Sequence, residues 1–142
     1  MIKLSIPPKE MRRVTEEIRK RKSVYEANLA RVLFKGALDI ESGAKMKAPV
    51  DTGRLRSSIQ SKIDHEDVSA EVTVNVDYAP YVEFGTGQYA REYLAGKPRE
   101  MVDHAREFKR PKDGYSPARP FLFPTYYEQR PKIIKALKRA KI

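Results

Sequence analysis

The sequence predicts an α+β fold, in which a long N-terminal helix packs on a small antiparallel sheet built on a hairpin, followed by a basic C-terminal helix. Two patterns carry this prediction. Apolar residues recur at helical spacing between about residues 9 and 47, and apolar and polar residues alternate strictly over 68–76. The chain has 142 residues, the length of one domain, so we expect a single domain over 1–142.

The expected N-terminal helix is long for a chain of this size. If unbroken, it would extend ~55 Å at a rise of 1.5 Å per residue. Gly36 or Gly43 could bend it, and Pro49 ends it because the residue before a proline avoids helical backbone. Its apolar stripe is wider than a two-stranded hairpin covers, which makes neighbouring subunits natural partners. The stripe comprises Val14, Ile18, Tyr25, Leu29, Val32, Leu33, Ala37, Ile40 and Ala44.

An antiparallel hairpin is expected after this helix. Its strands cover 59–63 and 68–76, and the charged turn "DHED" at 64–67 joins them. The segment before Pro7 and Pro8 is expected to be a strand or an arm.

The second half of the chain has weaker patterns. Residues 77–87 predict an aromatic-rich turn or a short helix that ends at Gly85. Residues 88–117 are expected to form a charged loop, with a short helix possible over 98–109. In the final helix, Pro124 suits the first turn, whereas Pro131 should kink or restart the helix.

Positive charge gathers at the two ends of the chain. The net charge is +10; residues 9–22 hold seven basic and three acidic side chains, and residues 128–142 hold six and one. Such ends suit a polyanion or an acidic protein surface, or are simply solvated helix faces. The basic surface is expected to include Arg12, Arg13, Arg19, Lys20, Lys132, Lys135, Lys138 and Arg139.

Composition excludes several classes of protein. The chain has no cysteine, and therefore no disulfide framework and no thiolate metal site. It has no apolar run long enough to cross a membrane, and its N-terminus lacks the apolar core of a signal peptide. We therefore expect a cytosolic product without a membrane partner.

The tripeptide Asp51-Thr52-Gly53 is the one that carries the catalytic aspartate in aspartic proteases. Its flanks argue against that chemistry, because Pro49 interrupts any preceding strand and Arg54 and Arg56 follow. Arginines beside a carboxylate dyad favour two ionised carboxylates and remove the acid partner. We expect instead that Asp51 caps a helical turn and that Gly53 permits a bend.

Other reactive constellations are weaker still. His65 lies in the charged turn, and His104 lies four residues after Glu100, but no second histidine or cysteine stands at ligand spacing. No glycine-rich phosphate loop is followed by a lysine and a hydroxyl residue. We therefore expect no catalytic residue, no cofactor and no metal. A nucleic-acid-binding module remains an alternative, since basic helices lie close to Tyr126 and Tyr127.

Three segments together resemble a known family of phage proteins. They are "APVDTGRLRSSI" (48–59), "YAPYVEFGTG" (78–87) and "PARPFLFPTYYEQRPKIIKALK" (117–138). In this order they are similar to the neck or tail-completion proteins of long-tailed bacteriophages, related to the lambda minor tail protein Z. The family has a shorter link where this chain has residues 88–117, so these are expected to be an insert.

The resemblance implies a non-enzymatic virion protein, assembled in the host cytoplasm, that forms a ring at the head–tail junction. Six copies are expected, with twelve as the alternative, in contact with adjacent connector, stopper and tail proteins and with DNA in the lumen. The rival hypothesis is a cytosolic DNA-binding protein that uses its basic terminal helices.

The site residues expected from these arguments fall into two further groups. A structural joint between the helix and the hairpin comprises Pro49, Asp51, Thr52, Gly53 and Arg54, with Arg54 or Arg56 able to pair with Glu83. Core or subunit-interface residues, two alternatives that the sequence does not separate, are Tyr78, Tyr81, Glu83, Phe84, Arg119, Phe121 and Phe123.

Overall fold

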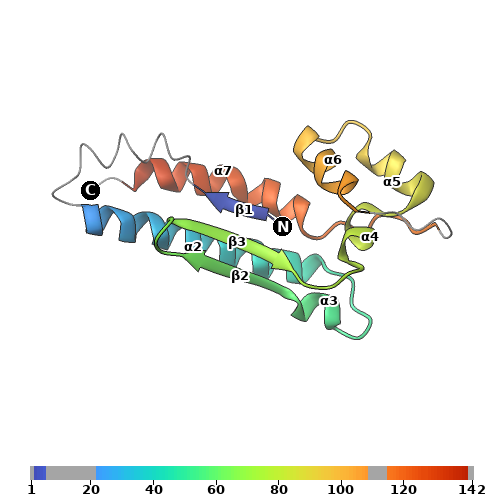
Figure 1. The fold of residues 1–142 in the computed structure, drawn as a ribbon, viewed down its shortest axis with the longest axis horizontal. Coiled ribbons are helices and arrows are strands. Elements are labelled where there is room, and N and C mark those ends of the chain that lie inside the picture. The colour runs from blue at the N-terminus through green and yellow to red at the C-terminus, as the bar shows by residue number, and fades with distance from the viewer. Residues whose placement is uncertain (1, 6–21, 109–114, 141–142) are drawn as a thin grey trace.

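A computed structural model describes residues 2–5, 22–108 and 115–140, with side chains from residue 24 onward. Helices pack against a small antiparallel sheet, which confirms the predicted α+β class (Figure 1). The elements are β1 (Ile2–Ser5), α2 (Lys22–Lys47), α3 (Arg54–Ser57), β2 (Ile59–Asp64), β3 (Ser69–Val74), α4 (Ala79–Phe84), α5 (Gly87–Leu94), α6 (Arg99–Arg106) and α7 (Phe123–Arg139).

The long helix α2 contacts both the sheet and α7. Together they form an elongated body, and the short helices α4, α5 and α6 gather at one end of it (Figure 1). The buried stripe of α2 includes Leu29, Leu33, Ala37, Ile40 and Ala44. The sheet and α7 cover this stripe within one chain. Over the described part of the helix, the stripe is therefore no evidence for a neighbouring subunit, whose presence stays a prediction.

The sheet has three antiparallel strands in the order β1-β3-β2. The hairpin of β2 and β3 is confirmed, and the leading segment is a strand that pairs Ile2 with Val72 and Ser5 with Ser69. The inward face carries Ile59, Ala70 and Val72, which are fully buried in the core. Burying one such aliphatic side chain contributes about 1.5–3 kcal/mol relative to leaving it exposed.

The hairpin turn differs from its expected form at one residue. The strand was expected to begin at Val68, but Val68 has a φ of 47° and β3 begins at Ser69. A left-handed backbone is costly for a β-branched residue, by about 1–2 kcal/mol. The buried Val68 side chain, which is only 3 % exposed, offsets this cost by its packing in the core.

Gly36 and Gly43 do not bend α2, which is a correction to the sequence expectation. The helix is continuous to Lys47, just before Pro49, as expected; its predicted part before residue 22 lies outside the described residues. A Cβ atom at Gly36 would lie 2.5 Å from Ile133, and one at Gly43 would lie 2.5 Å from Thr125. The glycines therefore let α7 approach α2 closely.

Two further expectations about the second half were wrong. Most of the segment at 88–117 is helical where the structure describes it, in α5 and α6, and only α6 had been considered. The helix α7 also continues through Pro131, so of the two expected effects, a kink or a restart, the restart was wrong. The buried side chains of Thr125 and Ile133 hold both halves of α7 on α2, which offsets the backbone hydrogen bond that a proline removes.

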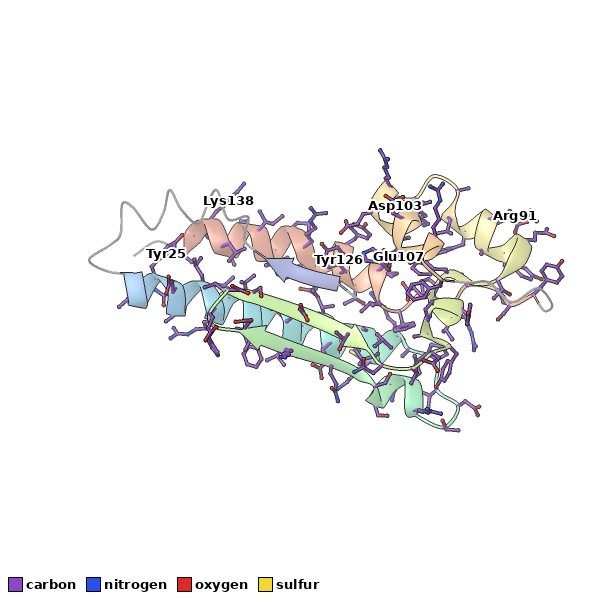
Figure 2. All side chains as sticks on the ribbon, viewed as in Figure 1. Tyr25, Arg91, Asp103, Glu107, Tyr126 and Lys138 are labelled. Atoms are coloured by element: carbon purple, nitrogen blue, oxygen red, sulfur yellow. The ribbon has the colours of Figure 1, made fainter. Side chains whose placement is uncertain are left out.

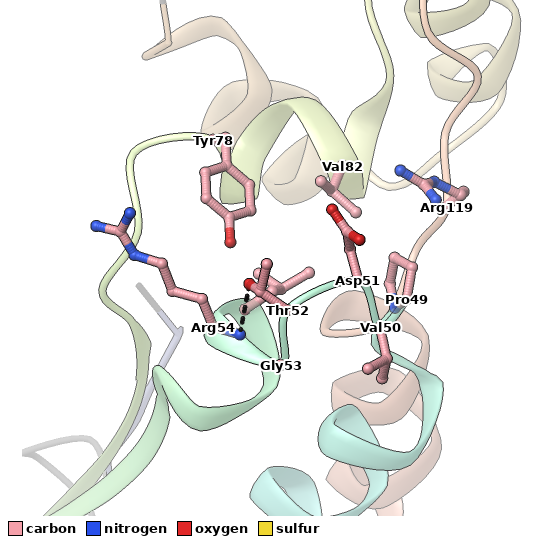
Figure 3. Close-up of a pocket in the computed structure, with 10 residues that line it drawn as sticks. Pro49, Val50, Asp51, Thr52, Gly53, Arg54, Tyr78, Val82 and Arg119 are labelled. Atoms are coloured by element: carbon pink, nitrogen blue, oxygen red, sulfur yellow. Dashed lines mark hydrogen bonds between the residues drawn. The ribbon is translucent and has the colours of Figure 1, made fainter.

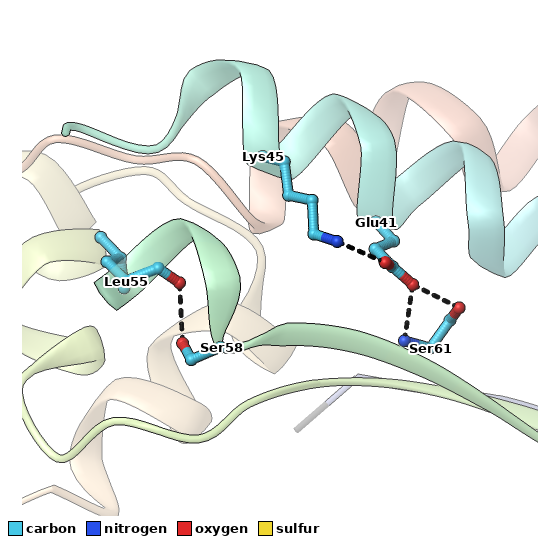
Figure 4. Close-up of polar contacts among 5 residues, drawn as sticks. All are labelled: Glu41, Lys45, Leu55, Ser58 and Ser61. Atoms are coloured by element: carbon cyan, nitrogen blue, oxygen red, sulfur yellow. Dashed lines mark hydrogen bonds and ion pairs between the residues drawn. The ribbon is translucent and has the colours of Figure 1, made fainter. Parts of the chain in front are cut away.

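A carboxylate from α2 closes part of the free edge of β2. The backbone N–H of Ser61 donates to Glu41 over 2.7 Å, and the Ser61 hydroxyl donates to the same oxygen (Figure 4). Lys45 donates to the other oxygen over 2.6 Å. Burial acts to raise the pKa of Glu41, but these hydrogen bonds outweigh it and hold that pKa below its ordinary value. An edge N–H that has an internal acceptor is not available to a foreign strand.

The close approach of α2 and α7 predicts that Gly43→Ala destabilises the fold. The added methyl group meets the Thr125 methyl group, and overpacking of this kind costs about 1–3 kcal/mol. Combining it with Thr125→Ser, which removes that methyl group and keeps the hydroxyl, should recover part of the loss. Urea unfolding midpoints measure both effects. The control Ser42→Ala, on the exposed face of the same helix, should not destabilise. Equal stability of Gly43→Ala and the wild type would contradict the close packing.

The Glu41 contacts predict a pH-dependent loss in Glu41→Gln. A carboxylate with a lowered folded-state pKa stabilises the fold above its unfolded-state pKa, and this contribution disappears as pH falls through the folded-state pKa. The variant should therefore be less stable by about 0.5–1.5 kcal/mol at pH 7. The difference should vanish as pH falls below 4.5. Denaturant titrations across this range measure it, with Glu66→Gln on the exposed turn as control. A difference that persists at low pH would refute the charge contribution.

Candidate functional site

The carboxylate of Glu83 lies at the start of α7. It accepts backbone N–H donors from Phe121 at 2.8 Å, Leu122 at 2.9 Å and Phe123 at 2.9 Å. The side chain belongs to α4 and is only 3 % exposed. A residue from one short helix thus caps the N-terminus of another helix about forty residues away in sequence.

This arrangement has the chemistry of a helix cap. The first N–H groups of a helix have no acceptor within it, and the helix dipole favours a negative charge there. Burial raises the pKa of Glu83 above its ordinary value, and the three N–H donors oppose that shift. Because both oxygens accept N–H donors, the geometry fits the ionised form. Burial and the Glu83 charge also raise the pKa of Tyr93 in α5 to about 12.

The chain before α7 is tied to the end of α4 by further backbone contacts. The Thr86 N–H donates to the Ser116 carbonyl over 2.9 Å, and the Ser116 N–H donates to the Thr86 hydroxyl over 2.7 Å. The Arg119 N–H donates to the Val82 carbonyl over 2.7 Å. Gly85 lies between these contacts with a φ of 75°, and a Cβ there would lie 2.7 Å from the Ala118 nitrogen. Only glycine fits this position.

Aromatic side chains fill the space beside Glu83. The Phe123 ring lies 5.5 Å from Phe84 and 5.6 Å from His104, measured between ring centroids. Phe84, Phe121 and Phe123 are all buried in the main core, so of the two alternatives they belong to the core of this chain. His104 packs against a ring, and no group of three potential metal ligands occurs among the described residues.

The expected joint forms one wall of a surface hollow, which we call the motif hollow (Figure 3). Its volume is about 210 Å³. Residues from all three phage-like segments line the motif hollow. No single segment could predict this shared site from the sequence. The lining residues are Pro49, Val50, Asp51, Thr52, Gly53, Arg54, Leu55, Tyr78, Val82 and Arg119.

Within the joint, two details differ from expectation. Asp51 is not the cap of α3: that position is Gly53, with a φ of 82°, and the Arg54 N–H donates to the Thr52 hydroxyl over 3.4 Å. Asp51 is exposed, and Figure 3 shows its carboxylate directed toward Val82 and Arg119. The expected pairing of Arg54 or Arg56 with Glu83 is also wrong, because backbone N–H groups enclose the Glu83 carboxylate.

The remaining candidate residues lie at the surface or between surface and core. Tyr78 and Arg119 are exposed at the motif hollow, and Tyr81 is half-buried. On α7, the four basic residues are all exposed, and no ion pair is found for them in the described part of the chain; Figure 2 labels Lys138 among them. They are Lys132, Lys135, Lys138 and Arg139. The expected basic residues Arg12, Arg13, Arg19 and Lys20 lie outside the described residues.

Sequence reasoning missed the roles of five residues. Glu83 was expected in the core or a subunit interface, paired with Arg54 or Arg56, and its role as the cap of α7 was missed. Thr125 is 1 % exposed, and its hydroxyl donates to the Phe121 carbonyl over 3.0 Å. The spacing of Gly36 and Gly43, seven residues apart, was the available signal for a close helix contact. Nothing in the sequence pointed to Glu41.

The contacts around Glu83 and Gly85 are hydrogen bonds between segments that lie far apart in sequence. No described helix is long and apolar enough to span a membrane. The chain belongs to the HK97-gp10-like family, described as "Bacteriophage HK97-gp10, putative tail-component", whose model matches residues 10–85. The expected phage family is thereby confirmed, and the protein is a structural phage protein of the virion tail. Comparisons with curated proteins and with solved structures gave no match.

The Glu83 cap predicts a large loss of stability in Glu83→Gln. In glutamine an NH2 group replaces one of the two accepting oxygens and cannot accept, so at least one buried N–H loses its acceptor, at about 1–3 kcal/mol. Chemical denaturation at pH 7 measures this loss. The control Glu66→Gln on the exposed turn should change stability by less than about 0.5 kcal/mol. If the two variants are equally stable, the capping role of Glu83 is refuted.

Proposed function

We propose that this protein forms a ring at the head–tail junction of a long-tailed phage or prophage, with DNA passing through its centre. Membership of a tail-component family is the observation that carries this proposal. In this proposal the protein is similar to the lambda minor tail protein Z, acts by assembly without catalysis, and contacts adjacent connector, stopper and tail proteins. Tail symmetry suggests six copies, and twelve is the alternative.

The exposed basic face of α7 supports the contact with DNA. Lys132, Lys135, Lys138 and Arg139 are four positive charges within two turns of one helix, near the end of the elongated body. Charges placed in this way neutralise phosphates without reading bases, as passage of any genome sequence requires. We therefore assign this face to the lumen of the ring.

The outer face of α2 supports contact with neighbouring subunits. Phe34 and Leu38 lie one turn apart on this helix and are 41 % and 43 % exposed, respectively. Exposed apolar side chains gathered on one helix face are typical of an interaction surface. In a closed ring, one surface of each subunit binds a different surface of the next subunit. The outer face of α2 would be one of these two surfaces.

The basic face of α7 also favours the alternative of a DNA-binding protein free in the cytosol. The two functions differ in assembly: the alternative requires a strict monomer with tight, steeply salt-dependent binding to DNA. A measurement of mass in solution together with DNA binding at several salt concentrations distinguishes them.

The ring proposal predicts where the protein lies in the particle. Gold-labelled antibody against the protein should bind purified particles at the head–tail junction, and particles made without the protein should separate into filled heads and free tails. Labelling along the whole tail, or intact infectious particles without the protein, would contradict the proposal.

The lumen assignment predicts the effect of neutralising α7. Replacing Lys132, Lys135, Lys138 and Arg139 by glutamine should lower the slope of log binding constant against log salt concentration by up to about 3–4, since each lost phosphate contact lowers it by about 0.9. Fluorescence anisotropy with duplex DNA measures the slope. The matched control replaces Lys35, Arg56, Lys62 and Arg91, which are exposed on other elements, by glutamine. An equal decrease in the control would overturn the assignment.

A further inference from the structure

Opposite charges lie at the two ends of the β2–β3 hairpin. At one end, the acidic turn (residues 64–67) exposes Asp64, Glu66 and Asp67. At the other end, the motif hollow exposes Arg54 and Arg119, with Asp51 as the one acidic residue in its lining. The six residues of β2 separate them by about 20 Å. Figure 1 shows the turn and α3 at opposite ends of the strand.

Four of these charged residues form no ion pair within the described part of the chain. No ion pair is found for Glu66, Asp67, Arg54 or Arg119 in the part of the chain that the structure describes. Other exposed charges do form such pairs, for example Lys47 with Glu128 at 3.2 Å. The two ends therefore keep complementary charges that a single chain cannot bring together.

The acidic turn is held in a fixed shape. The Asp64 carboxylate accepts the backbone N–H of Glu66 at 2.9 Å and that of Asp67 at 3.1 Å. The buried Val68 fixes the end of the turn in its left-handed backbone conformation. A turn held in this way loses little conformational entropy when it binds.

The motif hollow has the size and lining for such a turn. Its volume of about 210 Å³ suits one or two side chains rather than a folded element. Its rim is apolar at Val50, 55 % exposed, and at Tyr78, 39 % exposed. Arginine side chains over an apolar, aromatic rim can hold a carboxylate with paired hydrogen bonds.

We propose that the acidic turn of one copy of this chain docks into the motif hollow of the next copy. Because the two surfaces differ, the contact is head-to-tail and repeats from copy to copy until the ring closes. Glu66 and Asp67 face Arg54 and Arg119 across the interface. The inference rests on the proposed ring and names the two surfaces that build it.

Two charge-reversal variants test this interface. The first, Glu66→Lys with Asp67→Lys, makes the turn basic; the second, Arg54→Glu with Arg119→Glu, makes the hollow acidic. Each alone sets like charges against each other and should weaken self-association at least about tenfold, measured by sedimentation velocity. An equimolar mixture restores opposite charges at every contact, so it should assemble again, in rings with an even number of copies. Circular dichroism verifies that each variant is folded.

A control variant carries charge reversals away from both surfaces. Arg91→Glu with Lys97→Glu, at exposed positions on and just after α5, makes the same change in charge as the second variant and should leave self-association unchanged. Assembly of either reversed variant at the wild-type level, or a mixture no better than its components, overturns this interface. In that case the ring itself stands, because gold labelling of particles tests its location independently.

A covalent test covers weak association of the isolated protein. The chain has no cysteine, so Glu66→Cys with Arg54→Cys introduces one thiol at each end of the hairpin. Under mild oxidation these should join copies into a ladder of disulfide-linked oligomers, whereas Glu66→Cys with Lys132→Cys should not. Absence of the ladder, or an equal ladder in the control, overturns the proposal.

Discussion

The structure depends on one buried carboxylate. The Glu83 side chain extends from α4, and its carboxylate accepts hydrogen bonds from three N–H groups at the start of α7. The side chain is almost completely excluded from solvent there. A charged group in such a place is costly unless hydrogen bonds satisfy it. Removing either side of the contact therefore leaves a buried polar group without a partner. The carboxylate thereby ties the cluster of short helices at one end of the molecule to the long body.

The direction of α7 follows from this cap. Thr125 comes just after the capped turn and packs on Gly43, and Ile133 packs on Gly36 about two turns later. Glu83 fixes the first turn of α7, and the contacts of Thr125 with Gly43 and of Ile133 with Gly36 fix its position along α2. The helix α7 therefore has little freedom to rotate or slide on α2. The sheet then packs on α2 and completes the core. The basic residues of α7 are consequently held on its outward side.

The elements with a clear local period could be predicted from the sequence. The alternation at 68–76 and the stripe of α2 gave the hairpin and the long helix, because burial of one face imposes a period on the residues. Interactions between distant segments could not be predicted. Glu83, Thr125 and the two α2 glycines each depend on a partner far away in sequence, and α5 has too weak a pattern to distinguish it from a loop. Within the Asp51-Thr52-Gly53 tripeptide, Asp51 was wrongly given the role of a cap, because Gly53 occupies that position.

The three phage-like segments lie together in the folded chain. The second and third meet through Glu83 and the backbone bonds around Gly85, and all three line the motif hollow. The central claim is that Glu83 holds the start of α7. Amide hydrogen exchange of Phe121, Leu122 and Phe123, measured by NMR, tests it most directly. The account predicts protection close to that of the core strand β3. Exchange at the rate of an exposed loop would contradict it.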